Sequence, residues 1–384
     1  ESGQHGGGHG AAWLQRRRRQ ADRADRRQRI RRARAPSALA SPALADDLAP
    51  ISDLQVARLA RRTTGLAPKR MREPHLLRDG AETYEAMLEA IAAARHHIHL
   101  ASYIFDPDET GRRFRDALTA KAREGVAVRL LIDSVGSAGT RNRFFAALRA
   151  AGGEVAWFHP VRLRFARRPA LNQRSHRKLL IVDGRLGFTG GVNISDTQDP
   201  RRRADAFCDL HLRFSGAAVQ GLQVTFVEDW SYVTGAALCD DGFWPAMDSA
   251  GSPALVIPSG PDSSWEAYHR VSVEAIHDAT ARAARMALTN AALCGVDVRL
   301  MLPRRADSRL VSAAARSYYD ELLGAGVRIF EYQPNLLHAK TLLIDRHHVM
   351  IGSANFDNRS FRLNFELSMM IRDKAVTGEL AQLL

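Results

Sequence analysis

The feature that most constrains the fold of this chain is a motif that occurs twice. The first copy, SHRKLLIVDGRLGFTGGVNIS, covers residues 175–195, and the second, LHAKTLLIDRHHVMIGSANFDNRS, covers residues 337–360. Both copies read His-x-Lys, four residues, Asp, six residues, and then Gly-(Gly/Ser)-x-Asn. Because the spacing matches throughout and each copy opens an apolar stretch, the pattern predicts that one structural unit occurs twice.

Other segments return in the same order, which extends the duplication beyond the motif. GVAVRLLID at 125–133 returns as GVDVRLMLP at 295–303, and strand-like and helix-like segments alternate around both. That order predicts βαβ units on a largely parallel sheet. We therefore expect an α/β protein of two duplicated lobes, related by a pseudo-twofold axis and sharing one active site. Lobe 1 is expected at residues 51–250 and lobe 2 at residues 251–384.

Lobe 2 is shorter than lobe 1 in one place. The sequence from Ala275 to Ala287 is about 15 residues shorter than the aligned lobe 1 sequence from Ala90 to Ala117. The missing residues correspond to HIHLASYIF at 97–105, which has the alternation of a strand. We expect lobe 2 to be shortened near residues 281–285, with a short or irregular connection there and one strand fewer than lobe 1.

Positive charge is concentrated at the N-terminal end. The formal net charge is +13, and residues 1–35 contain eleven Arg against Glu1, Asp22 and Asp25. By composition, residues 1–50 are expected to form a disordered basic arm and linker. Two alternatives stay open for the arm, a clamp on anionic lipid and contact with nucleic acid. The sequence begins at Glu1 rather than at Met, so an anchor upstream of residue 1 also stays open.

The His-x-Lys pairs suit the chemistry of a phosphodiester. His176 and Lys178 are two residues apart, so on a strand they project from one face, and His338 and Lys340 repeat the arrangement. A phosphodiester needs a nucleophile, a proton donor for the departing alkoxide, and positive charge for its oxygens. We predict that the two His face one phosphorus within ~6–8 Å of each other, and that no metal is required.

Further candidate site residues follow in each motif. Asp183 and Asp345 lie too far along their strands to be nucleophiles, and we interpret them as partners that orient a His. Asn193, Ser353 and Asn355 are expected to bind the substrate. His96, His97 and His99 are expected to lie at a strand edge rather than to bind a metal, because no matching carboxylate or thiolate cluster accompanies them.

From about residue 52 onward the chain resembles the phospholipase D superfamily, and within it the bacterial cardiolipin synthases. The resemblance includes YIFDPDETG from Tyr103, LLIDSVGS from Leu130, DLH at 209–211, and SANFDNRSFRLNFE ending in Glu366. It implies a phosphatidyl–His intermediate, formed by one motif His while the other protonates the leaving alcohol. A second alcohol then displaces the His. On this resemblance we expect His176 to be the nucleophile and Glu366 to be a carboxylate of the site.

The resemblance also bears on partners and location. It implies phosphatidylglycerol or a related phospholipid as donor, no cofactor, and a peripheral position at the cytoplasmic face of the inner membrane. No membrane helix is visible in the sequence, so the chain resembles a helix-less type or a fragment. Hydrolysis of a phosphodiester, as a phospholipase D or a nuclease, stays open, as does a catalytically impaired membrane-associated protein.

Overall fold

The fold comes from a computed structural model, which describes residues 51–160, 173–238, 240–248, 250–261, 266–278, 284–304, 313, 316–333, 335–345 and 347–383. The basic arm expected at residues 1–50 lies outside the described residues, as does part of the shortened junction, residues 279–283.

Lobe 1 opens with helix α2 (Ile51–Thr64) and strand β1 (Lys69–Arg78). Its other strands are β2 (His97–Ser102), β3 (Ala127–Asp133), β4 (Glu154–Phe158), β5 (Leu179–Val182), β6 (Leu186–Gly190) and β7 (Leu210–Ser215). Its other helices are α3 (Asp79–Ala93), α4 (Glu109–Arg123), α5 (Ala146–Ala150) and α6 (Val219–Thr234), with the 3-10 turns η2 (Asn142–Phe145), η5 (Asp196–Gln198) and η6 (Asp241–Phe243).

The described part of lobe 2 repeats this order with fewer elements. Its strands are β8 (Ser252–Ser259), β9 (Arg299–Pro303), β10 (Arg328–Tyr332), β11 (Thr341–Ile344), β12 (His348–Gly352) and β13 (Glu366–Ile371). Its helices are α7 (Ala267–Asp278), α8 (Ala284–Leu293), α10 (Tyr319–Gly324), α11 (Asn358–Arg362) and α12 (Lys374–Leu383).

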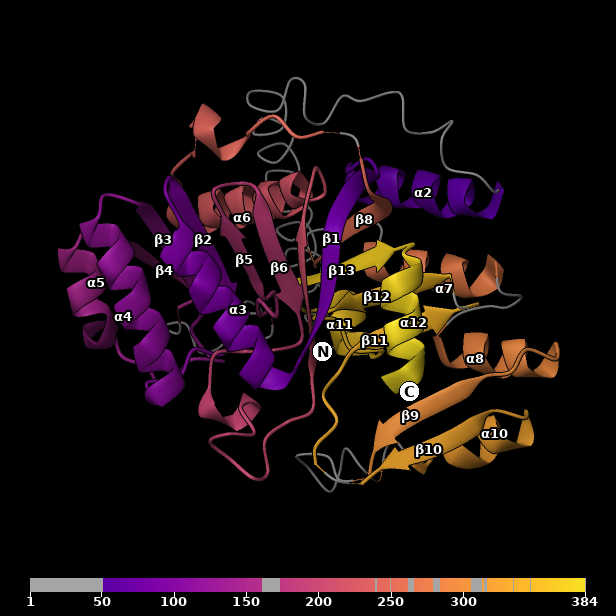
Figure 1. Cartoon of the computed structure of the whole chain (residues 1–384). Coiled ribbons are helices and arrows are strands. Elements are labelled where there is room, and N and C mark those ends of the chain that lie inside the picture. Colours follow the sequence, from indigo (N-terminus) through magenta and orange to yellow (C-terminus); the bar gives the residue numbers. More distant parts are fainter. Residues whose placement is uncertain are drawn as a thin grey trace, which may run out of the picture.

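The strands of both lobes join in one sheet. Its eleven strands run in the order β11-β12-β13-β8-β1-β7-β6-β5-β2-β3-β4, and the lobes meet where β1 pairs antiparallel with β8. Outward from that pair, β1-β7-β6-β5 and β8-β13-β12-β11 follow the same order, as Figure 1 shows. The two duplicated α/β lobes expected from the repeats are therefore confirmed.

The expectation of a largely parallel sheet is wrong. Parallel pairing is confined to β2 with β3, β3 with β4, and β9 with β10, which are the strands joined through helices. The remaining pairs are antiparallel, including the β5–β6 and β11–β12 hairpins that carry the motifs. Short connections after Asp183 and Asp345 impose the antiparallel direction, because a tight turn cannot return a strand to a parallel position.

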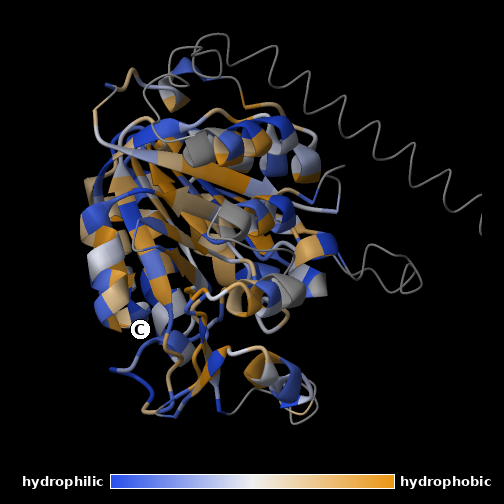
Figure 2. Ribbon diagram, turned by 90° about the vertical axis from the view of Figure 1, so that its right-hand side faces the viewer, coloured by the Kyte–Doolittle hydropathy of each residue, from blue (hydrophilic) through white to orange (hydrophobic). Residues whose placement is uncertain are grey.

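Helices cover the sheet and bury its apolar residues. One core cluster spans both lobes, and it packs Trp230 of α6 and Leu380 of α12 against β7 and β13. A second cluster holds α3 and α4 on the other face of lobe 1, and a third places α2 beside α7 in lobe 2. Figure 2 shows the hydrophobic residues gathered along the strands within the helices. In the part of the chain that the structure describes, no helix is long and apolar enough to cross a bilayer.

In the described part of lobe 2, no strand takes the place that β2 has in lobe 1. In lobe 1, β2 pairs with β5 on one side and with β3 on the other. In lobe 2, β11 ends the large sheet and β9 and β10 form a separate two-stranded sheet, so no described strand lies between β11 and β9. Residues 94–108 connect α3 to α4, whereas only residues 279–283 connect α7 to α8. The two equivalent motif strands also differ in burial. All four residues of β5 are buried, whereas only Ile344 of β11 is buried.

Candidate functional site

The two His-x-Lys segments meet between the lobes. The His176 N–H donates to the carbonyl of Phe365 at 2.8 Å, and the His338 N–H donates to the carbonyl of Cys208 at 2.8 Å. The first motif therefore begins beside the segment that leads into β13 of lobe 2. The second motif begins beside the segment that leads into β7 of lobe 1. This reciprocal pairing brings one His from each lobe to one interface.

Each His ring faces a carboxylate of the other lobe. Nδ1 of His176 is 3.3 Å from Oε1 of Glu366, and Nδ1 of His338 is 2.5 Å from Oδ2 of Asp209. Both carboxylates are almost completely buried. Because Nδ1 of each ring contacts a carboxylate, Nε2 is the atom left for chemistry. The same arrangement, with Nδ1 held by a carboxylate and Nε2 reacting, occurs in Ser-His-Asp hydrolases.

The two Lys lie beside their own motif His. Lys178 Nζ donates to the carbonyl of His176 at 2.8 Å, and Lys340 Nζ donates to the carbonyl of His338. Burial lowers the pKa of Lys178 to about 8, against an opposing effect of Glu366 and with a further lowering by Lys340. The pKa of Lys178 therefore depends on charges of lobe 2.

Burial and these cations set the charge of the carboxylates. Burial raises the pKa of Asp209, but the charges of Lys340 and His338 outweigh it and bring this pKa to about 2. Burial likewise opposes ionisation of Glu366, yet the hydrogen bond and charge of His176 hold its pKa below the usual range. Burial lowers the pKa of His338, and Asp209 acts in the other direction. Both carboxylates are thus ionised near neutral pH.

Asp183 and Asp345 do not orient the His rings, which corrects our interpretation. The Asp183 carboxylate accepts the backbone N–H groups of Arg95, His96 and His97 at 2.8–2.9 Å, where β2 begins. A strand rises about 3.3 Å per residue, so Asp183 is roughly 16 Å along β5 from Lys178. Asp345 is exposed at the equivalent turn of lobe 2. No described strand lies beside Asp345 in the place that β2 has beside Asp183.

Ser353 lies behind Glu366 rather than at the open side of the site. It is fully buried, and its hydroxyl donates to Glu366 Oε2 at 2.6 Å. Gly191 takes the equivalent place in lobe 1, where a Cβ would lie 2.0 Å from Asp209 Oδ1. Asn355 is half-buried, and its N–H donates to Ser360 Oγ at 3.1 Å.

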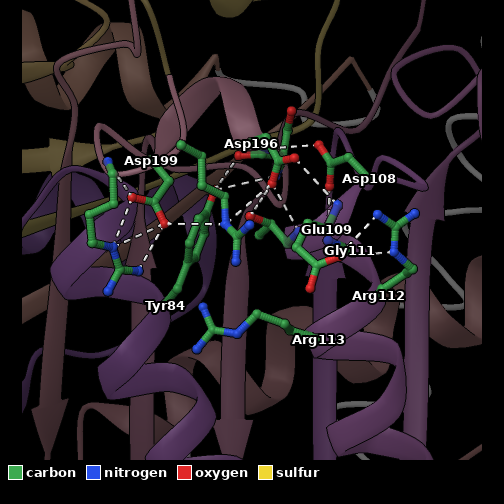
Figure 3. Close-up of polar contacts among 12 residues, drawn as sticks. Tyr84, Asp108, Glu109, Gly111, Arg112, Arg113, Asp196 and Asp199 are labelled. Carbon is green, nitrogen blue, oxygen red and sulfur yellow. Dashed lines mark hydrogen bonds and ion pairs between the residues drawn. The ribbon is translucent and has the colours of Figure 1, made fainter. Parts of the chain in front are cut away.

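Asn193 is held by a network around the loop that follows β6. Its Oδ1 accepts the Ile104 N–H at 3.2 Å, and the Tyr84 hydroxyl donates to its carbonyl at 2.6 Å. Figure 3 shows Tyr84 and, next to it, the chain of contacts through Asp196 and Asp108. Asp196 accepts from the N–H groups at the start of α4, and its own N–H donates to Asp108 Oδ2 at 2.6 Å. The network fixes the Asn193 loop against α3 and α4.

Several residues lie beside the motif His although the sequence analysis did not predict this placement. Asn364 Nδ2 lies 3.3 Å from His176 Nδ1 and donates to Glu366 Oε1 at 3.1 Å. The Tyr103 ring lies against His176, and the Phe207 ring lies 5.7 Å from that of His338. A signal for the carboxylates is present in the sequence, because Asp209-Leu-His and Glu366-Leu-Ser each open a buried strand at matching places in the two copies.

His97 and His99 are fully buried in a hydrogen-bonded chain rather than at a strand edge. His96 Nδ1 meets His97 Nδ1 at 2.9 Å, and Gln223 bridges His97 to His99 at 3.3 and 2.9 Å. Burial lowers the pKa of His97 to about 4 and that of His99 well below its ordinary value. Among the residues that the structure describes, no three His, Cys, Asp or Glu side chains are grouped so that they could hold a metal ion.

Comparison with known proteins agrees with this geometry. The family described as "Cardiolipin synthase, PLD-like domain" matches residues 87–230 and 266–384. Cardiolipin synthase 2 of Bacillus anthracis is 38% identical over 343 residues, which cover 85% of this chain and 66% of that protein. Cardiolipin synthase of Alkalihalophilus pseudofirmus is 39% identical over 325 residues, which cover 79% of this chain and 64% of that protein. The chain thus spans slightly under two thirds of the length of these relatives.

A solved structure agrees at the level of the fold. The phosphatidylserine synthase of Haemophilus influenzae aligns with a TM-score of 0.62 at 14% identity, covering 85% of this chain and 90% of that one. The family match extends through both lobes and contains both His-x-Lys motifs. With its duplicated lobes and its two motif His brought to one interface, this chain belongs to the cardiolipin synthase family of phospholipase D-like domain proteins.

Proposed function

We propose that this chain transfers a phosphatidyl group from one phospholipid to an alcohol of another, and so forms cardiolipin. The observation that carries the proposal is the reciprocal arrangement in which each motif His faces a buried carboxylate of the opposite lobe. The names of the most similar relatives support the choice of substrate class.

The proposed reaction has two displacements at one phosphorus. His176 Nε2 attacks the phosphorus of the donor, a P–N bond forms and the P–O bond to the leaving alcohol breaks. The protonated His338 gives its proton to that alkoxide. His338, now neutral, takes a proton from the acceptor alcohol, whose oxygen displaces His176 and forms the new P–O bond.

The remaining site residues would stabilise charge during both steps. Lys178 and Lys340 are proposed to balance the negative charge of the equatorial oxygens, together with the amides of Asn193 and Asn355. Asp209 and Glu366 would stabilise the imidazolium that each partner His becomes in turn. The choice of His176 as nucleophile rests on the family resemblance, since the two motifs are alike in spacing.

We further propose residues 51–250 and 251–384 as the two functional units, with α2 packing across onto α7 of the second. The partners would be anionic phospholipids, at the cytoplasmic face of the membrane and without a cofactor. Either the substrate lipids or the arm at residues 1–50 would supply the attachment to that surface.

Incubation of the purified chain with phosphatidylglycerol vesicles tests this function. Release of cardiolipin and free glycerol is expected, and excess glycerol should reverse the reaction. His176→Ala and His338→Ala should abolish turnover, whereas His75→Ala, at an exposed position of β1, should not. Phosphatidic acid without cardiolipin would instead identify a hydrolase, and cleavage of added DNA would identify a nuclease. If the chain produced neither cardiolipin nor phosphatidic acid and did not cleave DNA, the proposal would be contradicted.

A further inference from the structure

Tyr103 covers one face of His176. The centroids of the two rings are 4.1 Å apart, and the ring planes are inclined by 50°. The Lys178 ammonium stands 5.5 Å from the centroid of the same Tyr ring. From the loop directly after β2, Tyr103 therefore lies against both reactive residues of the first motif.

Two loops hold the Tyr103 ring in this place. A Cβ on Gly136 would lie 2.7 Å from Cδ2 and Cε2 of the ring and 2.2 Å from the Tyr103 carbonyl oxygen, so only glycine allows so close an approach. Ser137 Oγ donates to the same carbonyl at 3.1 Å and accepts the Phe105 N–H at 3.0 Å. These loops leave the neighbouring parallel strands β2 and β3, which fixes the ring relative to the sheet.

The sequence of lobe 2 is shorter at the place of this loop. The connection from α7 to α8 is residues 279–283, which read ATARA and contain no aromatic residue. Among the described residues, the aromatic ring beside His338 is that of Phe207, which comes from lobe 1 and lies farther away, with ring centroids 5.7 Å apart. The two motif His are thus alike in their carboxylate contacts but different in what covers their faces.

We propose that Tyr103 is a positioning residue, which locks the His176 ring so that Nε2 stays directed at the substrate phosphorus. Glu366 and Asn364 both lie 3.3 Å from Nδ1 of the imidazole, but contacts at one edge still allow the ring to rock about that edge. The Tyr103 ring, whose centroid is 4.1 Å from that of the imidazole, packs against the His176 ring and restricts this motion. The inference deepens the proposed function, because it assumes phosphodiester chemistry at His176.

The aromatic ring, rather than the hydroxyl, is the effective part. Burial raises the pKa of Tyr103, so the side chain is neutral at ordinary pH. A neutral ring face attracts cations, and the Lys178 ammonium lies against it. Phe would supply the same face, whereas Leu would not.

Kinetics of Tyr103→Phe and Tyr103→Leu test this inference on two substrates. Transfer from phosphatidylglycerol reports the proposed function, and hydrolysis of soluble bis(p-nitrophenyl) phosphate reports the His176 chemistry without a lipid. On each active substrate, Tyr103→Leu should lower kcat roughly 10- to 100-fold with little change in KM, because misplacement of a reacting group slows chemistry more than binding. Tyr103→Phe should stay within about twofold of the parent protein on the same reasoning.

Tyr318→Leu is the matched control, since it makes the same change at a side chain that is 45% exposed beside α10. Equal activity of Tyr103→Leu and the parent protein would overturn the proposal. So would a Tyr103→Phe variant as slow as Tyr103→Leu, because that result would assign the effect to the hydroxyl. If Tyr103→Leu does not fold, Tyr103→Met provides a flexible side chain of similar length without an aromatic face.

A chemical measurement separates this inference from the proposed function. Diethyl pyrocarbonate modifies accessible imidazoles, and mass spectrometry gives the rates at His176 and His338 in one sample. Tyr103→Leu should raise the rate at His176 relative to His338 several-fold, and Tyr103→Phe should leave the ratio unchanged. This readout holds even where neither substrate is turned over. An unchanged ratio in Tyr103→Leu would refute the positioning role whatever the substrate proves to be.

Discussion

Asp209 shows how individual residues balance charge in this site. It is buried, it stays ionised because Lys340 and His338 outweigh the effect of burial, and it raises the pKa of His338 in return. Its Oδ2 is 2.5 Å from His338 Nδ1, so the same contact also sets the direction of the ring. Removal of this one charge should therefore change both the geometry and the proton affinity of His338.

Asp209→Asn should lower kcat by roughly 10²- to 10⁴-fold, as loss of the carboxylate does in a His–carboxylate pair elsewhere. The carboxylate raises the pKa of His338, so its removal lowers that pKa further and makes the imidazolium scarcer near neutral pH. The activity optimum should accordingly move to lower pH in a pH–rate profile. Asp205→Asn, which breaks an exposed ion pair with Arg203, is the control. An unshifted optimum with reduced kcat would show that Asp209 acts by geometry alone.

Residue types and spacing predicted part of this site. His-x-Lys on a strand places two reactive side chains on one face, which depends only on the period of a strand, so His176 and Lys178 could be identified. The carboxylate partners could not be assigned in the same way. Asp183 is close in sequence yet at the far end of β5, whereas Glu366 is distant in sequence and meets His176 only because β13 lies across the lobe interface. Contacts across a domain interface leave no periodic trace in one sequence.

At the scale of elements, the missing strand explains why two like Asp residues have unlike surroundings. Asp183 holds the first N–H groups of β2, and both it and Gly184 have positive φ, 53° and 64°, as a tight hairpin turn requires. Asp345 has the same backbone conformation, with φ 50°, but is exposed beside the edge strand β11. The repeat alignment led us to expect a shorter lobe 2 at this place, because helix and strand lengths can be predicted from sequence. The mixed direction of the sheet was not predicted, since strand direction depends on pairing.

Asp183→Ala and Asp345→Ala should therefore differ in stability although both remove the same group. Loss of Asp183 leaves three N–H groups without their acceptor, which should lower the free energy of unfolding by about 2 kcal/mol or more. The cost of placing Ala at positive φ is common to both variants and cancels in the comparison. In urea denaturation at pH 7, the free energy of unfolding should therefore fall clearly less for Asp345→Ala than for Asp183→Ala. Equal losses would mean that the Asp183 contacts contribute nothing net.

At the scale of the whole molecule, buried neutral His residues make stability depend on pH. Burial lowers the pKa of His97 to about 4 and that of His211 to about 3, and it lowers the pKa of His99 as well. The unfolded chain takes up protons at these sites as pH falls through about 6.5, whereas the folded chain does not. The contribution of these His residues to the free energy of unfolding is therefore fully present above about pH 6.5, and it is lost progressively toward pH 4. Asp209, with its pKa at about 2, adds to the loss only at lower pH.

Urea denaturation at several pH values between 7 and 4 measures this loss. We expect the free energy of unfolding to fall by several kcal/mol over the range, since one pKa unit corresponds to about 1.4 kcal/mol. Among the described residues, neither ring nitrogen of His211 has a hydrogen-bond partner. His211→Met should therefore reduce the slope of the free energy of unfolding against pH, by the equivalent of up to one bound proton, without removing a hydrogen bond. His75→Ala, at an exposed position, should leave the slope nearly as it was. A flat profile in the parent protein would refute this account.

The crossed contacts His176–Glu366 and His338–Asp209 also have an evolutionary consequence. Duplication of a gene usually leaves a spare copy that is free to change, but here neither copy is spare. On the proposed function, each half supplies the carboxylate that the other half needs, so we expect a harmful substitution in either half to disable both. A single ancestral unit with this geometry would have needed a second copy of itself to complete the site, as in a symmetric homodimer. Fusion of the two units makes their encounter independent of protein concentration. Fusion also means that the two halves are inherited together and change together. One half could then lose a strand while keeping its residues at the shared site.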